Sequence, residues 1–204
     1  GLALAAGIPR DPKRAMEVIF GGHSSPVDAF YINEYFSCML SGIGFDAKVA
    51  HAFARRSKRG LITYIKVAAR NFFSAKPYPF QITSRSHDIK TEAFFISIAN
   101  SNQFGNQFTI APKARLNDGL IDVVIVQKMN KFQLMLAIIH QLRFGDVQEK
   151  IFRKKSILYF QTADLNIKNP SLAPLHIDGD PVDTADQFSI QVIPSAFRLL
   201  QPAH

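Results

Sequence analysis

The chain has 204 residues, of which 47% are hydrophobic, and its 24 Lys and Arg against 16 Asp and Glu give a formal net charge of +8 at pH 7. This length holds one large domain, or one domain and a piece of another, and the 18 Phe among the apolar residues exclude a disordered chain. No apolar run approaches the roughly 18 residues that span a bilayer, and the single cysteine, Cys38, excludes a disulfide framework.

Two helices are expected at the start of the chain. Residues 1–9 have the composition of a helix tail that ends at a glycine and a proline. A second helix is expected to begin after Asp11, an N-cap residue that is followed by proline, and to stop at Gly21 and Gly22.

A β-hairpin and a third helix are expected next. Residues 26–32 and 35–40 have the pattern of two short strands, and the Asn-Glu pair between them predicts a hairpin turn. The following glycines, Gly42 and Gly44, predict a second turn, after which a helix is expected from about Asp46.

Strands are expected to dominate the rest of the chain. Short and often alternating apolar segments predict them at residues 79–86, 91–100, 120–128, 156–163, 164–169, 175–178 and 187–193. Amphipathic helices are expected at 61–73 and, after the cap Asn130, at 131–145. Close-spaced short strands favour an antiparallel β-sandwich over a doubly wound parallel sheet, so the predicted fold class is mainly β with flanking helices (α+β).

The first stretch that can carry chemistry is ARLNDGLID, at residues 114–122. Its Asp118 stands beside a glycine in a loop that enters an apolar strand, and such a loop can offer one carboxylate and several backbone carbonyls to a hard cation such as Mg²⁺. The alternative is a tight turn, because Asn-Asp-Gly sequences are common in hairpins.

The second stretch is LHIDGDPVD, at residues 175–183. Gly179 allows a sharp bend that projects Asp178 and Asp180 from the end of a strand, where a carboxylate can act as a general base or hold Mg²⁺. An ordinary hairpin turn is again the alternative, and Asp183 is expected to be a surface residue.

Other candidates are weaker. The six His show no metal-ligand spacing, and Cys38 is expected to be a small core residue in an apolar strand. The basic residues of 55–59 either lie against anionic lipid headgroups or form the solvated face of a packed helix. The positive charge of the chain suggests a nucleotide, a phospholipid surface or a nucleic acid as partner, although many basic proteins have no such partner.

Four stretches occur in one order that resembles a known family: GLALAAGIPRDPKRAMEVI, FSCMLSGIGFDAKVA, IAPKARLNDGLIDVVIV and HIDGDP. The first is similar to the segment after that family's G-x-G-N loop. The others are similar to its patterns F-x-x-x-x-G-x-G-F-D-A, A-P-x-A-x-x-D-D-G-x-x-D and D-G-E-P. Together they resemble the C-terminal portion of the diacylglycerol kinase-like lipid kinases, the bacterial YegS and sphingosine-kinase-related group of the NAD kinase/diacylglycerol kinase-like superfamily.

The resemblance implies a domain organisation. Members of the family have an N-terminal α/β domain that binds ATP through a G-G-D-G-T motif, a C-terminal β-sandwich domain, and an active site in the cleft between them. Residues 1–22 are then a residual helical segment of the nucleotide-binding domain, and residues 23–204 are the β-sandwich domain. The ATP-binding loop is expected upstream of Gly1, so the fragment alone is expected to be inactive.

The resemblance also implies site residues and partners. Asp118 would hold a structural Mg²⁺ with the backbone carbonyls of Arg115 and Leu120. Asp180, with Asp178 beside it, would be the proton acceptor from the lipid hydroxyl. The implied partners are ATP as phosphoryl donor and a lipid at an anionic membrane surface, with no nucleic acid. A homodimer and a cytoplasmic location, peripheral to the inner face of the membrane, are further expectations.

The chain departs from the family pattern in places. Asp180 replaces the usual Glu and is one methylene shorter, Asn117 stands where a second acid is frequent, and Asn106 and Gln107 replace part of a glycine run. A NAD kinase-like enzyme and a non-catalytic lipid-binding or regulatory module therefore stay open as alternatives to a lipid kinase.

Overall fold

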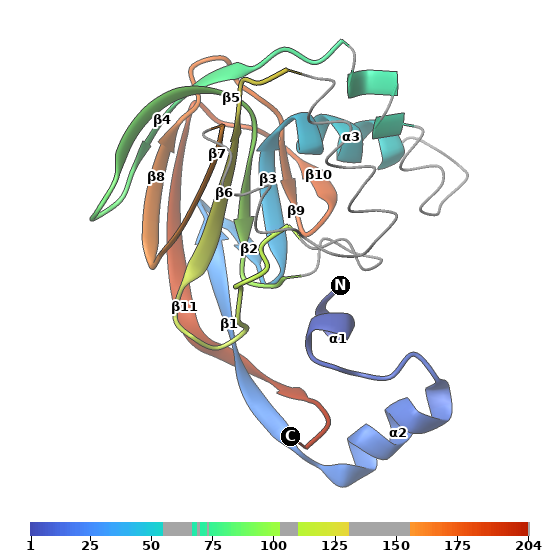
Figure 1. The fold of residues 1–204 in the computed structure, drawn as a ribbon. Coiled ribbons are helices and arrows are strands. Elements are labelled where there is room, and N and C mark those ends of the chain that lie inside the picture. The colour runs from blue at the N-terminus through green and yellow to red at the C-terminus, as the bar shows by residue number, and fades with distance from the viewer. Residues whose placement is uncertain (55–66, 69, 73, 103–109, 131–155, 204) are drawn as a thin grey trace.

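The computed structural model describes residues 1–54, 67–68, 70–72, 74–102, 110–130 and 156–203 (Figure 1). Its helices are α1 (Leu2–Ala5), α2 (Pro12–Gly21) and α3 (Phe45–Ala54). No helix within the described ranges is long and apolar enough to cross a membrane. The expected helix at 131–145 and the basic residues of 55–59 lie outside the described residues, as do Asn106 and Gln107.

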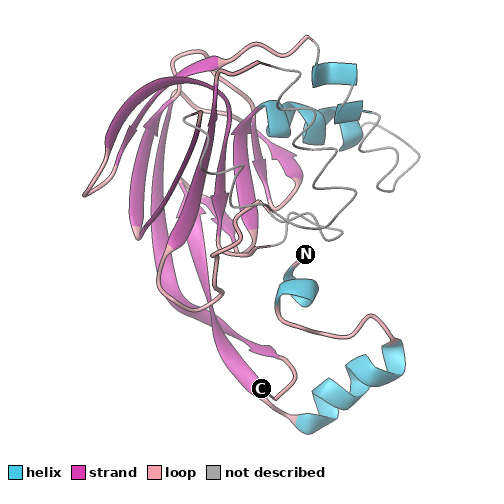
Figure 2. Cartoon of the chain, viewed as in Figure 1, coloured by secondary structure: helices cyan, strands magenta, loops and turns pink. Residues whose placement is uncertain are grey.

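Strands are the predominant secondary structure of the described chain (Figure 2). They are β1 (Ser24–Ile32), β2 (Tyr35–Ser37), β3 (Leu40–Gly44), β4 (Tyr78–Thr83), β5 (Asp88–Ala99), β6 (Ile121–Gln127), β7 (Ile157–Thr162), β8 (Asp164–Lys168), β9 (Leu175–Ile177), β10 (Asp180–Val182) and β11 (Gln187–Leu200). They form one sheet in the order β10-β9-β3-β5-β4-β8-β11-β1-β2, with β6 and β7 attached through β5. Each pairing seen among the described strands is antiparallel.

The sheet curls, and its two faces contact different parts of the core (Figure 1). Because side chains alternate along a strand, Val123 and Ile125 of β6 point to one face of the sheet. They lie there in a cluster of buried apolar side chains from several other strands. Val124 and Val126 lie in a second cluster, with Val49 of α3. Burial on both faces explains why β6 has a nearly continuous apolar sequence. The predicted fold class, mainly β and sandwich-like, is confirmed.

The predicted N-terminal helices and first hairpin are confirmed. The carboxylate of Asp11 accepts the N–H of Arg14 at 3.0 Å, and α2 ends at Gly21 with Gly22, whose φ is +67°, as its C-cap. Asn33 has a φ of +51°, which suits the hairpin turn between β1 and β2. The assignment of residues 1–22 to a separate nucleotide-binding domain stays a prediction.

The prediction for residues 35–44 is wrong in two respects. The expected strand at 35–40 ends at Ser37, and Gly42 and Gly44 lie within the buried strand β3 rather than in a turn. Gly44 has a φ of +110°, and a Cβ there would lie 2.6 Å from the carbonyl oxygen of Phe94. Glycine is therefore required at these two positions because other groups lie close to the backbone, and not because the chain changes direction.

Candidate functional site

The acidic turn at residues 178–180 joins β9 to β10. Ile177 pairs with Asp180, so Asp178 and Gly179 form a two-residue hairpin turn, with φ of +50° and +97°. Positive φ at both central residues is the requirement of a type I′ hairpin turn, which Asp-Gly satisfies. The side chain of Asp180 is exposed at the start of β10, and Asp183 is exposed as expected.

The carboxylate of Asp178 is fixed by the segment between β2 and β3. Its Oδ1 accepts the Ser37 hydroxyl at 2.6 Å and the N–H groups of Met39 and Leu40 at 3.1 and 3.0 Å. Its Oδ2 accepts the N–H of Cys38 at 3.1 Å. These bonds explain why the expected strand at 35–40 ends early: its backbone donors turn toward a side chain rather than toward a neighbouring strand.

Cys38 therefore lies in a bend and not in an apolar strand, which corrects its expected place. Its sulfur lies 3.7 Å from Oδ2 of Asp178, and the side chain is partly buried. Burial and, to a smaller extent, the nearby Asp178 carboxylate raise the pKa of the Cys38 thiol to about 11. The thiol is accordingly protonated near neutral pH and is not a nucleophile there.

The loop of Asp118 has the local form of an Asx turn. Asp118 is exposed, and its Oδ1 accepts the N–H of Leu120 at 3.1 Å. Gly119 has a φ of +73°, which turns the chain into β6. The tight-turn interpretation of this stretch is thus correct for its backbone, and the carboxylate stays at the surface.

Asp28, which is not among the predicted site residues, fixes the backbone of this loop. It is 2% exposed, its Oδ2 accepts the N–H of Gly119 at 2.6 Å and its Oδ1 accepts the N–H of Ser195 at 2.7 Å. Its own N–H donates to the carbonyl of Leu116 at 2.6 Å. An acid within the apolar stretch PVDAFYI was the available signal, because a buried carboxylate needs partners of this kind.

A buried amide connects the two acidic turns. Asn100 is 1% exposed, and its Nδ2 donates to the carbonyls of Asp28 and Cys38 at 2.7 and 3.2 Å. The backbone N–H of Asn100 donates to the carbonyl of Met39 at 2.8 Å. Through Asp28, Asn100 and the segment of Cys38 and Met39, the structure joins the loop of Asp118 to the turn of Asp178 in one hydrogen-bonded network.

A second buried acid lies just after the Asp118 loop. Asp122 in β6 is fully buried and accepts the Tyr159 hydroxyl and the amide of Gln161. Burial raises the pKa of the Asp122 carboxyl, an effect that its hydrogen bonds reduce and the Asp118 charge increases. Burial also raises the pKa of Tyr159, with the neighbouring Asp122 as the next cause.

The donor set of the Asp118 loop suits a magnesium ion. One carboxylate and the carbonyl oxygens of Arg115 and Leu120 are hard oxygen ligands, and such a set leaves room for the waters that Mg²⁺ retains. Asp28 fixes the loop backbone without using the Asp118 carboxylate. No cluster of three or more His, Cys, Asp or Glu that could hold a metal is present within the described part of the chain.

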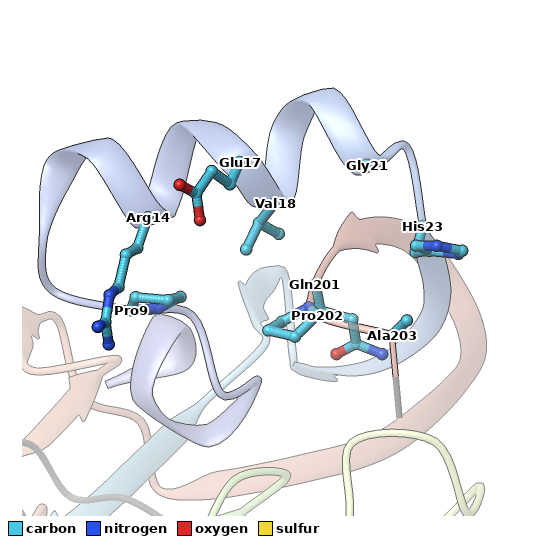
Figure 3. A pocket seen from close by; sticks show the side chains of 9 residues that line it. All are labelled: Pro9, Arg14, Glu17, Val18, Gly21, His23, Gln201, Pro202 and Ala203. Atoms are coloured by element: carbon cyan, nitrogen blue, oxygen red, sulfur yellow. The ribbon is translucent and has the colours of Figure 1, made fainter.

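A pocket of about 260 Å³ lies elsewhere, between α2 and the end of the chain (Figure 3). Arg14 and Glu17 of α2, together with His23 and Gln201, contribute its polar groups. None of the predicted site residues lines this pocket, so it is separate from the two acidic turns.

The chain is similar in sequence to bacterial proteins that are named probable lipid kinases. A probable lipid kinase YegS-like of Shewanella frigidimarina is 26% identical over 202 residues, which are 98% of this chain and 63% of that protein. A probable lipid kinase YegS of Salmonella arizonae is 25% identical over 204 residues, with 98% and 64% covered. The chain thus spans somewhat less than two thirds of the length of these relatives.

A solved structure has the same fold. A diacylglycerol kinase from Bacillus anthracis superposes with a TM-score of 0.69 at 16% identity, over 98% of this chain and 62% of that one. The sequence model of one family, the YegS C-terminal NAD kinase beta sandwich-like domain, matches residues 40–201. The chain therefore belongs to the YegS C-terminal domain family.

Proposed function

We propose that this chain is the C-terminal domain of an ATP- and Mg²⁺-dependent lipid kinase that phosphorylates a hydroxyl group of diacylglycerol or a related lipid. The observation that carries the proposal is the anchoring of Asp178, whose carboxylate accepts four hydrogen bonds and so fixes the turn that presents the exposed Asp180. The names of the relatives, probable lipid kinases, support the same reaction.

The chemistry of phosphoryl transfer suits this arrangement. Transfer requires a base near the attacking hydroxyl, positioning, and cations that balance the charge of the phosphates. Asp180 would take the proton of the lipid hydroxyl. The hydroxyl oxygen would then bond to the γ-phosphorus of ATP, while the bond between that phosphorus and the oxygen that leaves with ADP breaks. Asp118 and the carbonyls of Arg115 and Leu120 would hold a structural Mg²⁺. This ion would supply positive charge and stabilise the conformation of the loop.

The remaining partners are proposals of the same kind. ATP would be bound by the N-terminal domain that the resemblance implies, and the lipid would be met at an anionic membrane surface. The charge of +8 supports an anionic surface, because it raises the local concentration of the chain there. We expect the isolated 204 residues to show no transfer from ATP to lipid.

The test is Asp180→Asn in the intact protein, with ATP, Mg²⁺ and diacylglycerol in mixed micelles. Because Asp180 is exposed, the variant is expected to fold normally and to lose turnover by about a hundredfold or more. Asp183→Asn, an exposed acid three residues on, is the matched control and should leave turnover unchanged. Wild-type rates for Asp180→Asn would remove this residue from the role of base.

The choice of acceptor distinguishes the alternatives. Transfer to NAD and not to lipid would identify a NAD kinase-like enzyme, and liposome binding without transfer to either acceptor would identify a binding module. The exposed and shorter Asp180 is the observation that keeps the binding module in view. Asp180→Glu, which restores the longer acid, is expected to retain or raise lipid phosphorylation.

A further inference from the structure

A histidine and an aspartate lie together in the core beside the acidic turn. His176, in the middle of β9, is 2% exposed, and Asp46, at the start of α3, is 6% exposed. Nε2 of His176 lies 3.4 Å from Oδ2 of Asp46, while Oδ1 of Asp46 accepts the N–H of Ala47 at 2.8 Å. Two polar side chains buried this deeply require a structural or functional reason.

Gly42 of β3 is what makes room for this pair. A Cβ at Gly42 would lie 1.8 Å from Oδ2 of Asp46 and 2.7 Å from Nε2 of His176. Gly42 also pairs with His176 across β3 and β9. Gly42 and Asp46 of the sequence GIGFD are therefore linked structurally. Because Gly42 has no side chain, β3 leaves space for the polar groups of Asp46 and His176.

The other ring nitrogen of His176 faces the acidic turn. The backbone N–H of Gly179 donates to Nδ1 of His176 at 3.2 Å. An imidazole nitrogen that accepts a hydrogen bond carries no proton, so the ring proton sits on Nε2, the nitrogen that lies 3.4 Å from Oδ2 of Asp46. Asp46 thus favours the tautomer in which Nδ1 can hold Gly179.

We propose that Asp46 and His176 are a positioning pair for the acidic turn. Asp46 fixes the tautomer of His176, His176 fixes the N–H of Gly179, and Gly179 determines where the next residue, Asp180, presents its carboxylate. Neither member of the pair contacts substrate in this scheme. The inference rests on the proposed function only for the catalytic consequence, because the tautomer is a property of the folded chain itself.

The first test reads the tautomer directly. The intact protein is labelled with ¹⁵N-histidine, and the ring nitrogens of His176 are observed by NMR above neutral pH, assigned with His176→Asn. The wild-type ring should carry its proton on Nε2. In Asp46→Asn the new amide can donate to Nε2, so the proton should move to Nδ1. A wild-type ring protonated on Nδ1, or an unchanged tautomer in folded Asp46→Asn, would overturn the pair.

The second test separates the two ring nitrogens. The amide of an asparagine reaches the position of Nδ1, and that of a glutamine reaches the position of Nε2. His176→Asn should therefore keep kcat within about threefold, and His176→Gln should lower it about tenfold or more with KM little changed. Equal losses in the two folded variants, or a larger loss in His176→Asn, would contradict the proposal.

His51→Asn is the matched control. It removes another contact between α3 and β9, that of Nε2 with the carbonyl of Leu175 at 2.9 Å, without touching the turn. It should leave kcat at the wild-type value. A protein that phosphorylates no lipid but shows the expected tautomers would refute the proposed function alone, whereas an active kinase with the wrong tautomer would refute the positioning pair alone.

Discussion

The carboxylate of Asp178 accepts the backbone N–H of Leu40, a residue 138 positions earlier in the chain. The bond joins the β9–β10 hairpin to the first residue of β3, so the acidic turn is fixed to the strand that pairs with β9. Cys38 and Met39 donate to the same carboxylate. A turn that would otherwise be a mobile surface hairpin is thereby held in a defined place.

Asp178→Asn should lower the free energy of unfolding by about 2 kcal/mol, because an unsatisfied buried donor costs this much. The new amide faces the N–H of Cys38, a donor against a donor, while Asn still tolerates the positive φ of the turn. Urea denaturation of the two proteins measures the difference. Asp183→Asn, at an exposed acid, is the control and should stay within about 0.5 kcal/mol of wild type. Equal stability of all three proteins would show that the carboxylate of Asp178 is not required.

How much the sequence predicts depends on the distance along the chain over which each signal acts. The cap of Asp11, the turn at Asn33 and the apolar alternation at the start of β11 act over a few residues, and all three were predicted correctly. The early end of β2 and the role of Asp28 depend on partners 91 to 167 residues away, and pattern reasoning has no access to such pairs.

The glycines of β3 illustrate the same limit. Gly42 and Gly44 have the local signature of a turn, and tertiary contacts override that signature. For the candidate site, the sequence identified the two acidic turns through motif order. It did not identify Asn100, whose amide connects them, because a single Asn at the end of an expected strand carries no distinctive pattern.

Asp28→Asn should weaken the loop that carries Asp118. An asparagine keeps one acceptor and places an N–H₂ group against either Gly119 or Ser195, so the free energy of unfolding should fall by about 2 kcal/mol. In the intact protein the Mg²⁺ concentration for half-maximal activity should rise, because the loop backbone is no longer fixed. A magnesium titration of activity measures this effect. Asp88→Asn, at an exposed acid of β5, is the control, and the prediction fails if both variants give the wild-type titration.

Cys38 should react slowly with iodoacetamide in the folded protein. With the pKa raised to about 11 from 9.0, the thiolate fraction at pH 8 is about a hundredfold lower than for an unperturbed thiol. Alkylation followed by mass spectrometry should show a rate that still rises above pH 10 and that increases in Asp178→Asn, which lacks the nearby charge. The urea-unfolded protein, with the same single cysteine, supplies the reference rate. Equal rates in folded and unfolded protein would contradict the raised pKa.

The buried Asp122 should give the stability of the protein a distinct pH dependence. Its pKa is raised by burial, so the folded protein binds this proton more tightly than the unfolded protein does. The contribution of Asp122 to stability is therefore present at low pH. It is lost as the pH rises from the unfolded pKa, near about 4, through the raised folded pKa.

Asp122→Asn removes this titration and leaves a side chain that can still accept the Tyr159 hydroxyl. The free energy of unfolding, measured in urea at intervals from mildly acidic to neutral pH, should decrease more steeply with pH in wild type than in the variant. The other carboxylates titrate in both proteins, so the difference between the two curves isolates Asp122. A difference that is constant with pH, or that grows in favour of wild type as the pH rises, would show that Asp122 is ionised at no cost in the folded protein.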